Sequence, residues 1–290
     1  MHSNPLLIVN PESGRYSGRR VGYVTAELAR LGLNPRIVSV RTPKEVARYL
    51  CGAGRQSGHP FIVVAAGDGT FNAVLNCVEP GRATLAVLPL GTSNVLAAEL
   101  GIVSLDDGIQ RIVRGEYRLL QVGQIQMGEA SYYFGLMAGI GFDGAVVRDV
   151  GPFGKRVLKQ GAFAFSALQN CLRWDRRCIE IDSPSGCFTC HTAVVSNVSR
   201  YGGNFMLTPD QTPFLPGFTL ACVMGGQRRT YLRLAGDLFR GNVAANGDLL
   251  RLPATELEIR GTKPVQIDGD FVGYGPARIT TVPQFARLIV

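Results

Sequence analysis

Gly67-Asp68-Gly69-Thr70 combines residue types that suit an anion site with one that opposes it. The tetrapeptide lies between an apolar run, Phe61–Ala66, and a helically spaced segment, which predicts a strand, a glycine turn and a helix. Backbone N–H groups at a helix N-terminus favour phosphate, and glycines allow a close approach. Asp68 repels phosphate unless a metal ion or a hydrogen-bond network holds it. An ordinary turn with Thr70 as helix N-cap explains the same residues.

Two further loops of small residues also follow short apolar runs, and they are Asn10-Pro11-Glu12-Ser13-Gly14 and Gly91-Thr92-Ser93-Asn94. Each loop alone is weak evidence for a ligand site. Three such loops at strand ends of one α/β domain are hard to explain as independent turns, because those ends share one crevice. The pattern GxxxxGK[ST] is absent and none of these three loops contains GxGxxG, so a phosphate site here is neither a P-loop nor a standard Rossmann site.

A second acidic group, Asp268-Gly269-Asp270, lies near the end of the chain. In an extended segment the two carboxylates point to the same side. The same residues fit a hairpin turn, because Asp-Gly is a favoured turn dipeptide. Taken alone, these three residues favour the turn.

The segments that must position these residues change in character near Tyr117. Before it, short apolar runs alternate with helical patterns, which predicts an open parallel sheet. After it, strand patterns follow one another and predict a mostly antiparallel β-sandwich, interrupted by helices at Lys155–Trp174 and Arg228–Arg240. We therefore expect a nucleotide-binding α/β domain at residues 1–117, completed by a C-terminal strand at about 284–290, and a sandwich domain at residues 118–283.

Composition limits the function classes. The 290 residues carry a net charge of +8, which implies an anionic partner such as a nucleotide or an acidic membrane surface. No nucleic-acid-binding module is recognisable, so we expect no nucleic-acid partner. No stretch is apolar enough to span a bilayer, no secretory signal is recognisable, and the seven cysteines fit reduced thiols, which predicts a cytoplasmic protein.

Five sequence landmarks together resemble the diacylglycerol kinase catalytic family of bacterial lipid kinases. They are NPESG, AAGDGTFNAVLN, PLGTSNVLAAELG, GIGFDGAVV and QIDGDF, in the family's order from Asn10 to Phe271. The family includes diacylglycerol, sphingosine and ceramide kinases and, more distantly, NAD kinases. The resemblance implies an NAD-kinase-like α/β domain, a β-sandwich domain and an active site in the cleft between them.

The resemblance also implies the roles of individual residues. Its nucleotide-binding residues, in this numbering, are Asn10, Pro11, Ser13, Gly14, Thr42, Ala66, Gly67, Asp68, Gly69, Thr70, Asn72, Gly91, Thr92 and Asn94. Asp68 would belong to a hydrogen-bonded or Mg²⁺-linked network beside the phosphates of ATP. Asp268-Gly269-Asp270 matches the family's Asp-Gly-Glu, so the resemblance favours Asp268 or Asp270 as the catalytic base over a simple turn.

Some positions depart from the family pattern. Asp270 is one methylene shorter than the usual glutamate, and Val95 and Gln121 stand where many relatives have aspartates of the proposed Mg²⁺ network. Leu215-Pro216-Gly217 replaces the family's Asp-Asp-Gly, which argues against an accessory metal site. These departures keep open a nucleotide- or lipid-binding regulator with weakened catalysis.

We therefore expect an ATP- and Mg²⁺-dependent kinase that phosphorylates the hydroxyl of a membrane lipid such as diacylglycerol, a sphingoid base or ceramide. An NAD-kinase-like enzyme with a soluble acceptor is the alternative. The basic segment Arg148–Arg177 fits either a peripheral contact with an anionic membrane at its inner face or a core-packed helix with a solvated side. The acceptor lipid and the oligomeric state leave no recognisable motif.

Overall fold

Two separately packed units make up the chain: Met1–Gln121 together with Val282–Val290, and Val122–Thr281. The computed structural model describes residues 4–51, 59–157, 166–167, 169–171, 175–203, 205–240 and 247–290. The change of unit after Gln121 lies close to Tyr117, where the sequence pattern changes.

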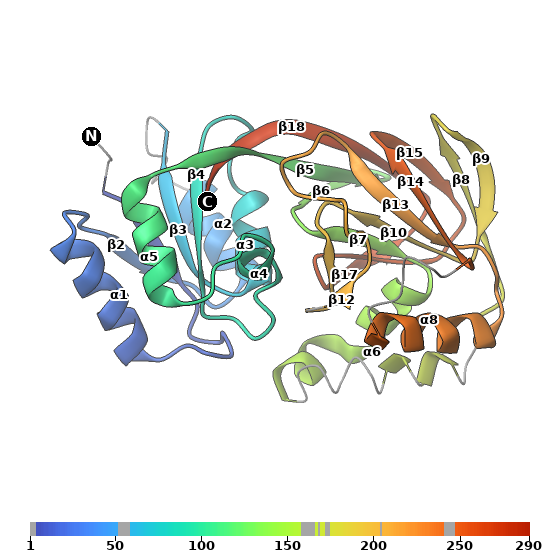
Figure 1. The fold of residues 1–290 in the computed structure, drawn as a ribbon, viewed down its shortest axis with the longest axis horizontal. Coiled ribbons are helices and arrows are strands. Elements are labelled where there is room, and N and C mark those ends of the chain that lie inside the picture. The colour runs from blue at the N-terminus through green and yellow to red at the C-terminus, as the bar shows by residue number, and fades with distance from the viewer. Residues whose placement is uncertain are drawn as a thin grey trace. The chain divides into compact units, whose positions relative to one another are not determined.

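The first unit is an open parallel sheet with helices between its strands, as the alternating pattern predicts (Figure 1). Its strands are β1 (Leu6–Val9), β2 (Arg36–Ser39), β3 (Phe61–Ala66) and β4 (Thr84–Pro89), in the order β2-β1-β3-β4. Its helices are α1 (Gly18–Arg30), α2 (Pro43–Cys51), α3 (Asp68–Leu75), α4 (Val95–Glu99) and α5 (Leu105–Arg114). The end of β18 (Ala277–Ile289) adds a fifth parallel strand, with Arg287 opposite Thr84 and Leu288 opposite Leu85.

Both faces of this sheet are buried, because helices cover each of them. Leu7, Val63 and Leu88 face one side and pack in one cluster with Val24 of α1 and Ile109 of α5. The neighbouring side chains face the other side, where Val64 and Val87 lie against Phe71 of α3 and Leu96 of α4. The strands therefore read as continuous apolar runs, and the loops at their carboxyl ends meet at one edge.

The second unit contains two antiparallel sheets. One has the order β14-β13-β10-β7-β16-β17, and in the other β15 lies between the start of β18 and β8, with β9 beyond β8 and a β5–β6 hairpin. The strands are β5 (Tyr117–Met127), β6 (Ala130–Phe134), β7 (Met137–Ile140), β8 (Ile179–Ser183), β9 (Gly186–Cys190), β10 (Thr192–Ser196), β13 (Phe218–Val223), β14 (Leu249–Ala254), β15 (Glu256–Arg260), β16 (Pro264–Ile267) and β17 (Asp270–Tyr274). The other elements are α6 (Phe142–Val157), α8 (Arg228–Arg240) and the short pair β11 (Arg200–Tyr201) and β12 (Phe205–Met206).

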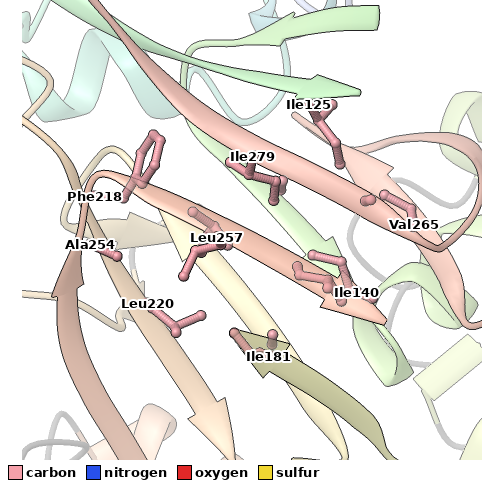
Figure 2. Packing of buried hydrophobic residues seen from close by; sticks show 14 of the residues in the cluster. Ile125, Ile140, Ile181, Phe218, Leu220, Ala254, Leu257, Val265 and Ile279 are labelled. Carbon is pink, nitrogen blue, oxygen red and sulfur yellow. The ribbon is translucent and has the colours of Figure 1, made fainter. Parts of the chain in front are cut away.

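The inner faces of these two sheets form one apolar core (Figure 2). Ile140 and Leu220 come from one sheet, and Ile181, Leu257 and Ile279 come from the other. All five side chains are buried. The predicted β-sandwich is therefore confirmed, and its core is built from the alternating inward positions of both sheets.

Several predicted boundaries are corrected. The last strand begins at Ala277, before its predicted start at about residue 284. The helix at Arg228–Arg240 is confirmed as α8. The helix predicted at Lys155–Trp174 falls mostly outside the described residues, as do most side chains of the basic segment Arg148–Arg177, while α6 begins earlier, at Phe142.

The buried end of β18 should contribute strongly to the stability of the first unit. Leu288 is fully buried, so Leu288→Ala should lower the free energy of unfolding by about 2–5 kcal/mol through lost burial and a cavity. Leu215, which is 45% exposed, is a matched control whose change to alanine should cost at most about 0.5 kcal/mol. Urea unfolding monitored by circular dichroism measures the free energy of unfolding of both variants. Equal losses would contradict the role of Leu288 in the stability of the first unit.

Candidate functional site

The loops that follow β1, β3 and β4 contact one another directly. Asn10 Nδ2 in the first loop donates a hydrogen bond to Thr70 Oγ1 in the second at 3.0 Å. The backbone N–H of Arg15 donates to the carbonyl of Leu90 at 3.0 Å, which joins the first loop to the third. The structure therefore brings the three loops together at one edge of the first unit. That they hold a nucleotide stays a prediction.

Gly14 leaves room for the Thr92 hydroxyl where the first and third loops meet. A Cβ atom added at Gly14 would lie 2.2 Å from Thr92 Oγ1, far inside the contact distance of two such atoms. Gly14 and Thr92 are both exposed, as are Gly69 and Ser93. The outer surface of the three-loop cluster is thus made of backbone and hydroxyl groups that a ligand can reach.

Asp68 is the side chain that fastens the second loop to the third. Its Oδ2 accepts the N–H of Val95 at 3.0 Å, and its Oδ1 accepts the N–H of Leu96 at 3.1 Å. These N–H groups begin α4 and lack partners within that helix. Burial raises the pKa of Asp68, and the backbone hydrogen bonds oppose that rise. The hydrogen-bonded alternative for Asp68 is therefore the arrangement present.

Asn94 explains why α4 needs a cap from another loop. Its backbone is left-handed, with φ of 49°, and its side chain makes no capping bond to α4. Instead, Asn94 Oδ1 accepts the N–H of Gly91 at 2.7 Å and Nδ2 donates to the Gly91 carbonyl at 3.0 Å, which closes the third loop on itself. Val95, one of the departures from the expected family pattern, contributes its backbone N–H to Asp68.

Other predicted nucleotide-binding residues take varied positions. Thr70 as an N-cap is wrong, because the N-cap of α3 is Gly67 and Thr70 lies within the first turn. Thr42 caps α2, because its hydroxyl accepts the N–H of Glu45 at 3.3 Å. Asn72 lies on α3, where its Oδ1 accepts from Asn76. Pro11 and Ser13 belong to the turn that Asn10 closes, and Ala66 ends β3.

The residues on this edge do not form a multi-carboxylate Mg²⁺ site. Both oxygens of Asp68 accept backbone N–H groups, and within the described part of the chain no three acidic, histidine or cysteine side chains gather as metal ligands would. Gln121, the other departure, accepts the N–H of Gln284 at 3.1 Å and so joins β5 to the end of β18. A role for Asp68 in binding Mg²⁺ stays a prediction.

Asp268 in the second unit is a structural anchor. It has φ of 47° and forms, with Gly269, the two-residue turn between β16 and β17, so of the two alternatives for residues 268–270 the turn is present and the extended segment is not. Its carboxylate accepts three backbone N–H groups, from Gly135 at 2.8 Å and from Leu136 and Met137 at 2.9 Å each. The turn interpretation of Asp-Gly was therefore correct, and this turn fixes the loop between β6 and β7.

Asp270 differs from Asp268 in both position and exposure. It begins β17 opposite Ile267, and its side chain is exposed. The turn before it is held by Gln266, whose Oε1 accepts the N–H of Gly269 at 2.8 Å. Of the two predicted acids, Asp270 is the exposed one, and its role as catalytic base stays a prediction.

An apolar pocket of about 300 Å³ lies within the second unit. Its walls are Phe142, Asp143, Ala167, Cys171, Thr192, Val194, Tyr201, Leu207, Ala221, Val223, Tyr231, Leu232, Leu234, Ala235 and Leu249. Most of these side chains are hydrocarbon, so the pocket suits an acyl or alkyl chain better than a polar ligand.

Asp143 is the buried acid in this pocket wall, and it was not among the predicted site residues. Its carboxylate accepts hydrogen bonds from the Tyr201 hydroxyl and from Gln266 Nε2, the latter at 2.7 Å. Burial raises the pKa of Asp143, and these two hydrogen bonds oppose the rise. Because Gln266 also holds Gly269, a hydrogen-bonded chain connects the pocket wall to the turn before Asp270. The landmark GIGFDGAVV contains Asp143 and was the available signal.

Comparisons with known proteins agree with this geometry. The model of the diacylglycerol kinase catalytic domain matches residues 4–125, and the model of the YegS C-terminal NAD kinase beta sandwich-like domain matches residues 137–290, more than half of the chain.

Individual relatives are similar over most of their length. The chain is 25% identical to a diacylglycerol kinase of Bacillus subtilis (strain 168), covering 79% of this chain and 77% of that protein. It is also 25% identical to a diacylglycerol kinase of Mycobacterium tuberculosis (strain CDC 1551 / Oshkosh), covering 84% and 81%. A crystal structure of a diacylglycerol kinase from Bacillus anthracis str. Sterne superposes with a TM-score of 0.71 at 17% identity, covering 99% and 96%, which shows a shared fold.

The close approach of Gly14 to Thr92 can be tested with two matched glycine-to-alanine substitutions. Gly14→Ala should weaken ATP binding at least about tenfold, because the new methyl group must turn away the Thr92 hydroxyl, which is one of the predicted nucleotide contacts. Gly22→Ala in α1 meets nothing within 4 Å and should leave ATP affinity unchanged while stabilising the helix by up to about 1 kcal/mol. Calorimetric titration with ATP measures both; equal affinities for the two variants would contradict the cluster as a nucleotide site.

The raised pKa of Asp143 gives a pH dependence with a definite sign. The pKa of Asp143 in the folded protein lies above its unfolded value of about 4, so the folded protein binds this proton more tightly than the unfolded chain does. The free energy of unfolding gained from this proton is fully present below about pH 4 and is lost as pH rises through the folded pKa. Relative to Asp143→Asn, which cannot titrate, the wild type should therefore lose unfolding free energy as pH rises from about 4. Tyr201→Phe, which removes a hydrogen bond that lowers this pKa, should extend the loss to higher pH. Urea unfolding across pH tests this; a constant difference would exclude it.

Proposed function

Because the chain belongs to the diacylglycerol kinase catalytic-domain family, we propose that it transfers the γ-phosphate of ATP to the hydroxyl of a membrane lipid. The observation that carries this proposal is the three-loop cluster, in which Asp68 and Asn10 join the ends of three parallel strands. Diacylglycerol, a sphingoid base and ceramide are the acceptors considered.

The first unit would hold the nucleotide. Exposed backbone and hydroxyl groups at Gly14, Gly69, Thr92 and Ser93 offer hydrogen bonds to phosphate oxygens. The N-terminus of α3 adds the favourable end of a helix dipole. Electrostatic repulsion between Asp68 and the phosphates is reduced in this arrangement, because the carboxylate of Asp68 accepts hydrogen bonds from the N–H groups of Val95 and Leu96. The net charge of +8 favours the approach of a polyanion.

The second unit would hold the lipid. Its apolar pocket of about 300 Å³ offers room for hydrocarbon, and Asp143 with Tyr201 gives the wall one polar point. The hydrogen-bonded chain from Asp143 through Gln266 to Gly269 fixes this wall relative to Asp270. A lipid whose chain lies in the pocket would therefore be held in a defined position relative to Asp270.

Asp270 is the proposed catalytic base. Its carboxylate accepts the proton of the lipid hydroxyl while the hydroxyl oxygen forms a bond to the γ-phosphorus. The bond from that phosphorus to the bridging oxygen breaks, and ADP leaves with the electron pair. Asp268 is a positioning residue in this proposal, because all three N–H groups of residues 135–137 use its carboxylate.

Mg²⁺ would accompany the nucleotide, since this ion commonly keeps several waters and binds substrate phosphates with few protein ligands. When bound, it would neutralise phosphate charge. A lipid acceptor also places the protein at a membrane, and within the described residues no helix is long and apolar enough to cross one. We therefore propose a cytoplasmic protein that binds the inner face of an anionic membrane peripherally.

The direct test incubates the full chain with labelled ATP, Mg²⁺ and each candidate lipid in neutral detergent micelles, with NAD as a soluble alternative acceptor. Label in one of the lipids supports the proposal. Label in NAD and in no lipid would establish the alternative acceptor, and no transfer to any acceptor would overturn the kinase assignment.

Substitutions of Asp268 and Asp270 should have different effects on catalysis and on stability. Asp270→Asn should lower kcat by about 10²–10⁴-fold, the usual contribution of a general base, and change the unfolding free energy by no more than about 0.5 kcal/mol. Asp268→Asn should cost about 1–3 kcal/mol of stability, because an amide cannot accept all three N–H groups.

Asp270→Glu, the residue found in the family pattern, is the conservative variant and should retain transfer. Initial rates with labelled ATP, together with urea unfolding, distinguish the variants. Undiminished transfer by Asp270→Asn would exclude Asp270 as the base.

A further inference from the structure

We propose that α8 is the surface by which this chain binds an anionic phospholipid bilayer, and that the pocket of the second unit opens to the bilayer beside this helix. The proposal rests on the proposed function only for the identity of the pocket's ligand. It assigns the membrane contact to one helix, Arg228–Arg240, and identifies where a lipid chain enters.

The outer side of α8 is strongly basic. Arg228 and Arg229 are exposed, as are Arg233 and Arg240 further along the helix. Positions four and seven apart share one side of a helix, so Arg229, Arg233 and Arg240 lie on one face, with Arg228 at its edge. Arg233 also pairs with Asp248 at 2.9 Å, whereas the helix sequence itself contains a single acid, Asp237. This face complements a negatively charged surface.

An apolar side chain lies within the basic face. Leu232 is 68% exposed, although a leucine gains about 1.5–3 kcal/mol when it leaves water. A bilayer covers such a residue and binds the surrounding arginines through its head groups, which is the pattern of helices that lie in the membrane interface. The charge of the face favours anionic phospholipid over a neutral surface.

The same leucine lines the pocket. Leu232, Tyr231, Leu234 and Ala235 all contribute to the pocket wall, while Leu232 and Ala235 are also exposed. Residues that border both the pocket and the solvent mark its mouth. The mouth therefore opens on α8 next to the arginines, so a lipid chain can pass from the bilayer into the pocket without crossing a polar surface.

The inner side of α8 is held firmly, so the helix has a defined outer face. The buried Tyr231 ring packs against Phe142 with 4.7 Å between ring centroids. Its hydroxyl lies 2.7 Å from Thr192 Oγ1 and 2.5 Å from His191 Nδ1. Figure 1 shows α8 on the outside of the second unit.

Vesicle sedimentation of the full chain without ATP tests the surface independently of phosphate transfer. The chain should sediment with vesicles of phosphatidylcholine and phosphatidylglycerol in about equal amounts, and not with phosphatidylcholine alone. The double variant Arg229→Glu with Arg240→Glu should lower the partition coefficient at least about tenfold, since each arginine near such a surface contributes measurably. Leu232→Ser should also lower it about tenfold, through lost apolar burial.

The matched control reverses two exposed arginines of the first unit, Arg30→Glu with Arg82→Glu, and lowers the net charge by the same amount. It should keep most of the vesicle binding. Equal losses in both double variants would show that overall charge, and not α8, drives binding, and would overturn the proposal. No binding by the wild type would also overturn it, as would a dimer in sedimentation velocity that Leu232→Ser dissociates, because a second copy would then cover the face.

The lipid kinase assay in neutral micelles separates this proposal from the proposed function. Transfer in micelles without binding to anionic vesicles would leave the kinase intact and exclude the α8 surface. Vesicle binding that depends on Arg229, Arg240 and Leu232, without transfer to any lipid, would support the α8 surface and exclude the kinase.

Discussion

The hydrogen bonds from Val95 and Leu96 to Asp68 are the interaction on which the candidate nucleotide site depends. They join an acid at the start of one helix to the uncapped start of another. A carboxylate that accepts backbone N–H groups forms strong, charge-assisted hydrogen bonds. The cost of burying the acid is thereby partly offset, and the hydrogen bonds join the second loop to the third.

Asp268 repeats this solution in the second unit. It too binds successive backbone N–H groups of a distant loop, at residues 135–137, and thereby leaves the neighbouring Asp270 as the exposed acid. In each unit an acid that marks the site in sequence therefore organises backbone. In the proposed function, chemistry falls to groups beside it: hydroxyl and backbone groups in the first unit, and one carboxylate in the second.

The architecture could be predicted from sequence, because local periodicity determines it. Apolar runs such as Leu6–Val9 and Phe61–Ala66 are buried on both faces and alternate with helices, and the later strands have an inner apolar face. The roles of the acids could not be predicted in this way. Asp143 is bound by Tyr201 and Gln266, which are 58 and 123 residues away, and no local spacing shows such partners. At Asp268, local turn chemistry determined the backbone, and the family resemblance did not.

The last strand also determines the order in which the chain can complete its fold. β18 closes the parallel sheet through Arg287 and Leu288, which follow the second unit in the chain. Until they emerge from the ribosome, β4 presents an open edge, and open edges invite pairing with other chains. The strands of the first unit therefore complete their sheet only after the second unit has been made. A truncated product would carry that exposed edge permanently, which makes premature termination a hazard for aggregation as well as for activity.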